Sequence, residues 1–183
     1  NNNNQAPSRL RTCLTCQLFS AAGHPAPRCN LAAVVVNQEP MGAYVHVEAI
    51  KKRMLANAFG DDSGSLYEGT IADFTADHLA TAGAGQLGRW DTKTGDTDEK
   101  GGPLLSVVEA LKASDAELEA ALGRVIDIPA FIRFWALETF AGHTDGYTSN
   151  RNNFYVYFDP QNRAQGEKFG RAVFIPWGAD NVL

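Results

Sequence analysis

The segment from Asp127 to Asp180 constrains the fold most, because an apolar helix pattern there leads through polar loops into two apolar strand patterns. Asp127 followed by Pro129 is typical of a helix start, and the run IPAFIRFWALETFAG carries apolar side chains at helical spacing. The runs NFYVYFD and RAVFIPW come after a polar loop and are separated by a polar turn. This order predicts an α+β fold in which a core helix precedes a β-hairpin. The side chains expected on the buried face of the helix are Ile128, Phe131, Ile132, Trp135 and Leu137.

The residues upstream predict a second, smaller set of elements. Apolar side chains at helical spacing in residues 8–22 predict a helix that ends near Gly23 and Pro25. The runs LAAVVVN and GAYVHVEAI then predict two antiparallel strands joined by a short loop, and residues 51–59 predict a short helix. Residues 60–102 are rich in Gly, Asp, Thr and Ser and are expected to be irregular. Helices are expected again over 103–113 and 114–123, the second opened by a capping box from Ser114 to Glu117.

Length and charge exclude several classes of protein. A chain of 183 residues with 44% hydrophobic residues can bury one core, so residues 8–183 are expected to form a single domain behind a disordered lead-in, 1–7. The net charge is -5, and no run of Lys or Arg is long enough to follow a phosphate backbone, so nucleic acid is not expected as a partner. No apolar stretch approaches the roughly 18 residues that a membrane span needs.

The three cysteines leave two interpretations open. They are too few for a disulfide framework and leave one odd thiol, which slightly favours a reducing compartment. Cys13, Cys16, His24 and Cys29 follow a C-x2-C-x7-H-x4-C spacing that could form a tetrahedral zinc site. Leucines recur at helical spacing through the same stretch, however. This favours Cys13 and Cys16 as small, partly buried hydrophobic residues of a helix.

Two acids and an amide stand at the ends of the predicted helix and strands. Asp145 and Asn150 have the D-x4-N spacing of a protein-kinase catalytic loop, and His143 stands two residues before Asp145. Asp180 lies in a second acidic loop after the hairpin. Phosphoryl transfer needs one carboxylate to orient the substrate hydroxyl and further oxygen ligands to hold a hard cation against the nucleotide phosphates. Taken alone, Asp145 in a Gly-containing loop after a helix is more often a turn former than a catalytic residue. The order of helix, loop, hairpin and acidic loop reverses this and favours the functional interpretation.

The same residues resemble one family. The stretch GHTDGYTSNRNNFYVYFDP followed by FIPWGADNVL is similar to the signature of the CotH (spore coat protein H) kinase family, which runs from an Asp-rich loop into a strand and ends in Pro-Trp-Asp-x-Asp. Three earlier stretches match features of that family in the same order: AAGHPAPRCN, VVVNQEPMGAYVHVEAIKKRMLANAFG and SLYEG. The resemblance covers residues 8–183, with the Gly-rich middle matched poorly.

The resemblance implies an atypical, protein-kinase-like fold. Residues 8–50 would be part of an N-lobe, built of a helix and antiparallel strands, and residues 51–183 part of a helical C-lobe whose β-hairpin carries the catalytic and metal loops. The chain would be truncated at both ends. The implied activity transfers the γ-phosphoryl group of ATP to Ser or Thr of a protein, of the spore-coat or surface type, with Mg²⁺ or alternatively Mn²⁺. Family members occur in spore coats and among secreted or surface proteins, so the location stays open.

The resemblance also implies residue roles. Asp145 would be the catalytic carboxylate, with Asn150 and Asn153 near the metal and the phosphates, and Asp180 a metal ligand. The segment that contains Glu48 and Ile50 would lie at the hinge that meets the adenine.

Two departures favour an alternative function. Gly178 follows Trp177 where the family has Asp, and the helix over residues 8–22 has no Glu for the usual Lys-Glu ion pair. The protein could therefore be a non-catalytic, pseudokinase-like coat or surface component. A carbohydrate-binding module is a third and weaker hypothesis, based on Trp90, Trp177 and the loops rich in Asp and Asn.

Overall fold

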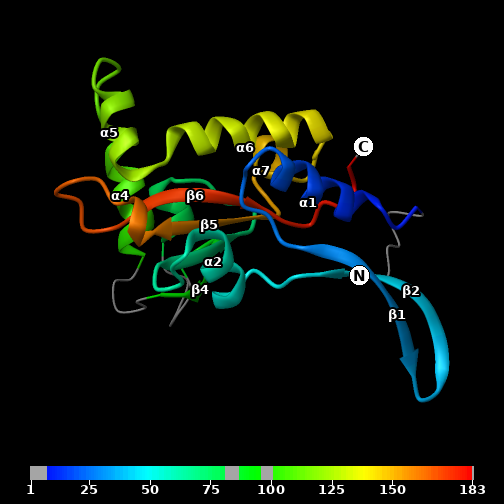
Figure 1. Ribbon diagram of the computed structural model, residues 1–183. Helices are drawn as coiled ribbons and strands as arrows, with labels where there is room; N and C mark the ends of the chain where they lie inside the picture. Colours follow the sequence, from blue (N-terminus) through cyan, green and yellow to red (C-terminus); the bar gives the residue numbers. More distant parts are fainter. Residues whose placement is uncertain (1–7, 81–86, 96–100, 183) are drawn as a thin grey trace.

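The computed structural model describes residues 8–80, 87–95 and 101–182, and it has an α+β fold with two antiparallel sheets (Figure 1). The first elements are the helix α1 (Arg11–Ala21), the strands β1 (Cys29–Val36) and β2 (Glu39–Val47), and the helix α2 (Lys52–Phe59). All four agree with the sequence prediction to within a few residues. The division into kinase-like lobes at residue 50 stays a prediction, and the expected lead-in over residues 1–7 lies outside the described part of the chain.

The larger part of the fold is built around a four-stranded sheet. Its strands follow the order β4-β3-β5-β6, and every neighbouring pair is antiparallel. The predicted hairpin is confirmed as β5 and β6, in which Val156 pairs with Phe174. The elements of this part are β3 (Ser65–Gly69), α3 (Ala76–Leu79), β4 (Trp90–Thr94), α4 (Gly102–Ala110), α5 (Leu118–Val125), α6 (Ile128–Ala141), α7 (Tyr147–Asn150), β5 (Phe154–Asp159), a 3-10 helix (Pro160–Asn162) and β6 (Arg171–Pro176).

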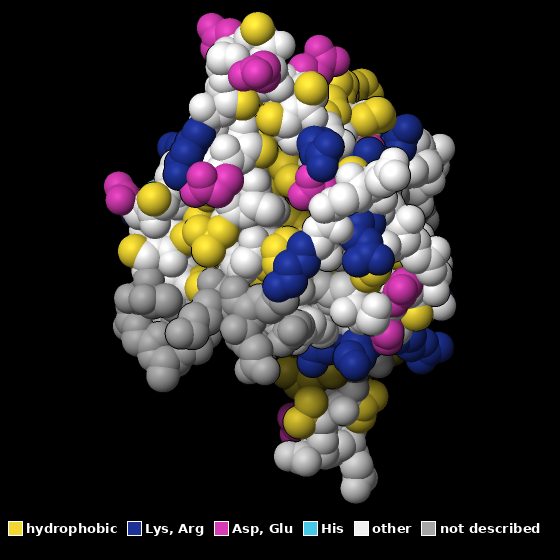
Figure 2. Space-filling model, turned by 90° about the vertical axis from the view of Figure 1, so that its left-hand side faces the viewer, with side chains coloured by type: hydrophobic (Ala, Val, Ile, Leu, Met, Phe, Trp, Pro, Cys, Tyr) yellow, Lys and Arg dark blue, Asp and Glu magenta, His cyan; other side chains and the backbone are white. Residues whose placement is uncertain are grey.

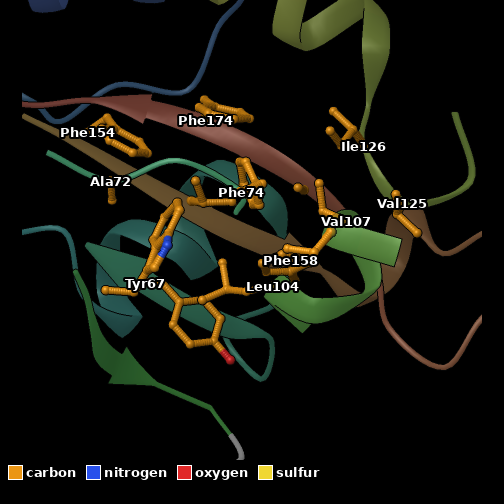
Figure 3. Close-up of a cluster of buried hydrophobic side chains, with 14 of the residues drawn as sticks. Tyr67, Ala72, Phe74, Leu104, Val107, Val125, Ile126, Phe154, Phe158 and Phe174 are labelled. Carbon is orange, nitrogen blue, oxygen red and sulfur yellow. The ribbon is translucent and has the colours of Figure 1, made fainter. Parts of the chain in front are cut away.

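Both faces of this sheet are covered, because successive side chains of a strand point to opposite sides. Phe154, Val156 and Phe158 of β5 belong to the larger core, together with side chains of α4, α5 and α6. Figure 3 shows part of this core, including Phe154 and Phe158 of β5 and Leu104 and Val107 of α4. Tyr155 and Tyr157 point the other way, into a second cluster that includes Met54 and Leu55 of α2. β5 is buried along its whole length, so its position fixes both cores.

The buried face of α6 differs from the predicted one. Ile132 is 62% exposed and Trp135 is 47% exposed, whereas Phe134 and Glu138 are fully buried. Residues 134 and 138 lie on the same face of the helix. The spacing of apolar residues did not predict that this face is buried, because an acid stands at its centre. The prediction was wrong about Ile132 and Trp135 and correct about the helix itself, which begins after the capping residue Asp127.

Two further expectations are corrected in the middle of the chain. The strand β4 lies in the stretch expected to be irregular, where it pairs with β3. The helix expected over 114–123 begins only at Leu118 and continues to Val125. Ser114 does not cap it as predicted, since its hydroxyl donates to the Glu117 side chain over 2.7 Å.

The β1-β2 hairpin projects from the rest of the molecule (Figure 1). A disulfide between Cys13 and Cys29 ties it to α1. This bond contradicts the zinc alternative, because the two thiols are joined to each other and His24 instead lies 2.8 Å from the Phe174 carbonyl. Cys16 is buried and free. A disulfide is typical of an oxidising environment, which is the opposite of what the cysteine count favoured.

Two expectations from the sequence concern nucleic acid and a membrane span. On the face shown in Figure 2, basic side chains are spread over the surface with acidic ones among them. Within the described residues, the structure contains no helix with the length and apolar character of a membrane span.

Replacing Cys13 and Cys29 together with Ser should lower the free energy of unfolding by about 2–4 kcal/mol, because the disulfide restricts the unfolded chain and anchors a two-stranded sheet that is marginal by itself. Urea denaturation with and without dithiothreitol measures the loss. The reductant should destabilise the native protein and a Cys16→Ala control, and leave the double variant unchanged. Equal stability of the oxidised and reduced native protein would contradict this expectation.

Acid should destabilise the protein through His24. Burial lowers the pKa of this imidazole from 6.5 to about 4, with the bond to Phe174 opposing the shift. Between these values the unfolded chain binds a proton that the folded chain does not, so the free energy of unfolding falls as the pH drops from 6.5 to 4. The loss amounts to about 3 kcal/mol. A His24→Gln variant keeps a donor for Phe174 but does not titrate, and urea denaturation should show a smaller acid loss for it. If the free energy of unfolding depended on pH in the same way in both proteins, the role of His24 would be refuted.

Candidate functional site

The segment between α6 and β5 gathers three asparagine side chains around one carboxylate. Asn150 Nδ2 donates to Asp145 Oδ1 over 2.6 Å, and Asn153 Nδ2 donates to Asp145 Oδ2, also over 2.6 Å. Asn152 Nδ2 makes longer bonds to the same carboxylate, of 3.3 and 3.4 Å. The structure therefore brings together Asp145, Asn150 and Asn153, which the sequence assigns to one site.

The backbone of this segment explains how three amides reach one carboxylate. α7 is a single turn that ends at Asn150, and Arg151 and Asn153 then have positive φ angles of 54° and 50°. Asn tolerates this left-handed conformation better than most residues do. The chain doubles back within a few residues, which brings Asn152 and Asn153 to the same carboxylate as Asn150.

These bonds keep Asp145 ionised. The hydrogen bond from Asn150 lowers the pKa of Asp145 most, partial burial opposes it, and the bonds from Asn152 and Asn153 lower it further. At neutral pH the group is therefore a carboxylate whose orientation is fixed by neutral donors.

A buried acid of α6, Glu138, holds the same segment through its backbone N–H groups. Glu138 Oε2 accepts from the Thr148 backbone N–H over 2.9 Å, and Oε1 accepts from Tyr147 N–H over 3.4 Å. His143 Nδ1 lies 3.2 Å from the same Oε1. A side chain at Gly146 would begin only 2.5 Å from Glu138 Oε1, so the turn after Asp145 packs directly on this carboxylate.

A third support comes from the loop after β3. Asp73 accepts from the Tyr147 hydroxyl over 3.2 Å and from Arg151 Nη1 over 3.3 Å. The Ala72 N–H donates to the Arg151 carbonyl over 2.8 Å. This loop therefore fixes both ends of α7.

Asn153 joins this segment to the loop after β6. Its carbonyl accepts from the Trp177 N–H over 3.1 Å, and a side chain at Gly178 would begin 2.6 Å from its amide oxygen. The Asp180 N–H in turn donates to the Gly178 carbonyl over 2.9 Å. Asp145 and the Asp180 loop thus lie on either side of a single residue, Asn153.

A cavity of about 320 Å³ opens between α1, β2 and the loop after β6. Thr12 is only 7% exposed, and its hydroxyl has no hydrogen-bond partner among the described residues. Burial raises the pKa of the Cys16 thiol to about 11, with a bond to its own backbone opposing the shift, so this wall carries a neutral thiol. The lining residues are Thr12, Thr15, Cys16, Pro27, Val45, His46, Val47, Pro176, Trp177, Gly178, Ala179 and Asp180.

The two residues assigned to the hinge lie beside this cavity, outside its lining. The Glu48 side chain accepts from Arg28 Nε over 3.0 Å and lines a separate hollow of about 490 Å³. Ile50 is 4% exposed and belongs to the core cluster under α2. The strand residues just before them, Val45 to Val47, line the cavity instead. The role of Glu48 and Ile50 at an adenine stays a prediction.

The oxygen atoms around Asn153 are of the type that a hard cation binds. Carboxylate and amide oxygens are the ligands that Mg²⁺ accepts, and Asp145, Asn153 and Asp180 supply both types. Over the described ranges, no group of three His, Cys, Asp or Glu side chains is placed to hold a metal ion. Amide oxygens, or oxygens of a bound ligand, would have to complete such a site.

The chain has an α+β fold in which Asn153 connects the Asp145 carboxylate to the loop that lines the cavity. The family of CotH kinase proteins matches residues 1–183, and the chain belongs to this family. A search of curated proteins finds no match.

Sequence reasoning missed Glu138 and Asp73, which support the site from two sides. Glu138 did carry a signal, because it is an acid within an apolar helix and lies one turn after Phe134. Asp73 carried none, since it stands in a polar stretch that resembles many loops.

Replacing Asn150 with Ala should raise the pKa of Asp145, because it removes the bond that lowers this pKa most. NMR titration of the carboxyl carbon measures the change. Glu48 is an internal control, since the bond from Arg28 lowers its pKa at a separate place and should be unaffected. An unchanged Asp145 titration would show that Asn150 does not bond it in solution.

Proposed function

We propose that the protein transfers the γ-phosphoryl group of ATP to a Ser or Thr hydroxyl of a protein substrate, with Mg²⁺ or Mn²⁺ as the metal. The observation that carries this proposal is the fixed, ionised carboxylate of Asp145, which Asn153 connects to the loop that lines the cavity. Membership of the CotH kinase family supports the same reaction class.

Asp145 would accept a hydrogen bond from the substrate hydroxyl and so orient it for attack. A carboxylate has about four acceptor sites, and the three asparagine amides already use them. The two bonds from Asn152 are the longest of the set, at 3.3 and 3.4 Å. A hydroxyl can therefore replace Asn152 while Asn150 and Asn153 keep the carboxylate in place.

Asn153 and Asp180 would hold the metal. A bound divalent cation neutralises the charge of the phosphates and of the phosphoryl group in transfer. The residues of this chain contribute position: Asn153 is locked by its bonds to Asp145 and Trp177, so its amide oxygen is fixed before any ligand binds. Such pre-organisation is the main way in which a protein accelerates phosphoryl transfer.

The nucleotide would enter the cavity between α1 and β2. A volume of about 320 Å³ lies at the lower end of the range for small-molecule sites. The apolar lining from Val45 and Pro176 suits a purine ring, and the buried Thr12 hydroxyl offers a hydrogen bond to it. The phosphates would extend toward Asp180, which also lines the cavity.

Gly178 supports the alternative of a non-catalytic interaction protein. Its φ angle is 59°, and an acid there would clash with Asn153 as it now stands. The site thus lacks one negative charge at the position where the family has Asp. A fold kept for partner binding would tolerate this loss, whereas a phosphotransferase has to hold its metal with fewer charges.

Replacing Asp145 with Asn should lower the rate of phosphoryl transfer by about 10²–10⁴-fold, the usual contribution of a positioned acid or base. Transfer from radiolabelled ATP to a Ser-rich acceptor protein measures it, and thermal shift with Mg²⁺-ATP measures binding. Asp115→Asn, at an exposed position remote from the site, is the matched control and should behave as the native protein does.

Two outcomes separate the functions. Stabilisation by Mg²⁺-ATP together with transfer that depends on Asp145 supports the enzyme. Absence of both in the native protein would refute it and favour the interaction protein.

A further inference from the structure

Glu138 is an acid in a place where acids are rarely found. It is fully buried on α6, next to Phe134 in the larger core. A buried carboxylate is unfavourable unless donors replace its lost hydration. Within the described residues the side chain that contacts it through a polar atom is His143, whose Nδ1 lies 3.2 Å from Oε1, and no Lys or Arg pairs with it. Its remaining donors are the two backbone N–H groups of Tyr147 and Thr148.

These donors all belong to the segment that carries Asp145. The bonded residues stand at positions 143, 147 and 148, on both sides of Asp145. Gly146, directly after Asp145, has no room for a side chain because Glu138 and His143 occupy the space. α7 lies against α6 (Figure 1), so the carboxylate fixes this turn to a rigid helix.

Core stability alone does not explain an acid at this position. A neutral or apolar side chain of similar size would avoid the desolvation of a charge and would often leave a buried site as stable or more stable. What only an acceptor with two oxygens can do is bond two successive backbone N–H groups and a histidine at once. The chemistry of Glu138 thus matches the task of setting a backbone conformation.

We infer that Glu138 is a positioning residue, which sets the backbone on both sides of Asp145 and thereby the direction of the catalytic carboxylate. This inference rests on the proposed function for its catalytic part. Its structural part, the control of the Asp145 segment by Glu138, does not depend on any reaction. The asparagines hold the Asp145 side chain, and Glu138 holds the backbone from which it projects.

Glu138→Gln tests the structural part. The amide keeps the shape of the side chain but has only one acceptor oxygen, so Tyr147 N–H or Thr148 N–H must lose its partner. Hydrogen exchange at the amide that loses its partner should become about 10- to 100-fold faster, and the side-chain amide signals of Asn150 and Asn153 should shift. Unchanged exchange and unchanged asparagine signals would overturn the inference, whether or not the protein is an enzyme.

The catalytic part is tested by kinetics on the same variant. The kcat for phosphoryl transfer should fall at least about tenfold, while the KM for ATP stays within about twofold, because the cavity is lined by other elements. Faster exchange with an unchanged kcat would overturn the positioning role. A native protein without any transfer would instead refute the proposed function, and the exchange result would still decide the structural part.

Phe134→Leu is the matched control, since it alters the same buried helix face, and the aromatic partners of Phe134 are Phe19, His24 and Phe174, which lie outside the Asp145 segment. It should lower the melting temperature and leave exchange at Tyr147 and Thr148 and the value of kcat nearly as in the native protein. If Glu138→Gln does not fold, Gly146→Ala tests the same contact from the other side, because its methyl group would begin 2.5 Å from Glu138 Oε1. Native exchange and a native kcat in Gly146→Ala would then overturn the inference.

Discussion

Hydrogen bonds to two carboxylates, one buried and one partly exposed, determine how the chain passes from α6 into β5. Glu138 fixes the start of the turn through backbone N–H groups, and Asp145 fixes its end through the amides of Asn150 and Asn153. β5 follows at once, is buried along its length and contributes to both core clusters. The packing on both sides of the sheet therefore depends on a polar turn, which explains why so many of its donors and acceptors are satisfied.

Local patterns predicted most elements of the fold, because each depends on neighbouring residues. The hairpin of β5 and β6, the helix α6 with its Asp127 cap, and the pair β1 and β2 all followed from periodicity and turn residues. Other features depend on distant residues and could not be read locally. β4 is a strand because β3 is beside it, and Cys13 meets Cys29 because a hairpin folds back on α1. The buried face of α6 was misjudged since Glu138, an acid, lies at its centre.

Sequence reasoning grouped correctly those residues of the candidate site that lie in one short segment. Asp145, Asn150 and Asn153 lie within nine residues of sequence, so one loop suffices to join them. Their catalytic and metal roles stay predictions, as does that of Asp180. Glu48 and Ile50 were assigned from the order of elements in a kinase, and such an order fixes a strand end only to within a few residues. The structure lines the cavity with the preceding residues of β2.

Gly178 bears on both candidate functions, because a neutral amide oxygen lies where a side chain at residue 178 would begin. In the family pattern an acid follows the Trp, whereas here the amide oxygen of Asn153 occupies the space that such a side chain would enter. In the proposed site an oxygen would thus remain near the metal, but a neutral one. Metal affinity depends on the number of charged ligands, so the site should bind its cation more weakly and rely more on the nucleotide phosphates to complete the coordination. Tight cation binding in the absence of nucleotide would then argue against this account, whereas binding that requires ATP is what the arrangement around Asn153 favours.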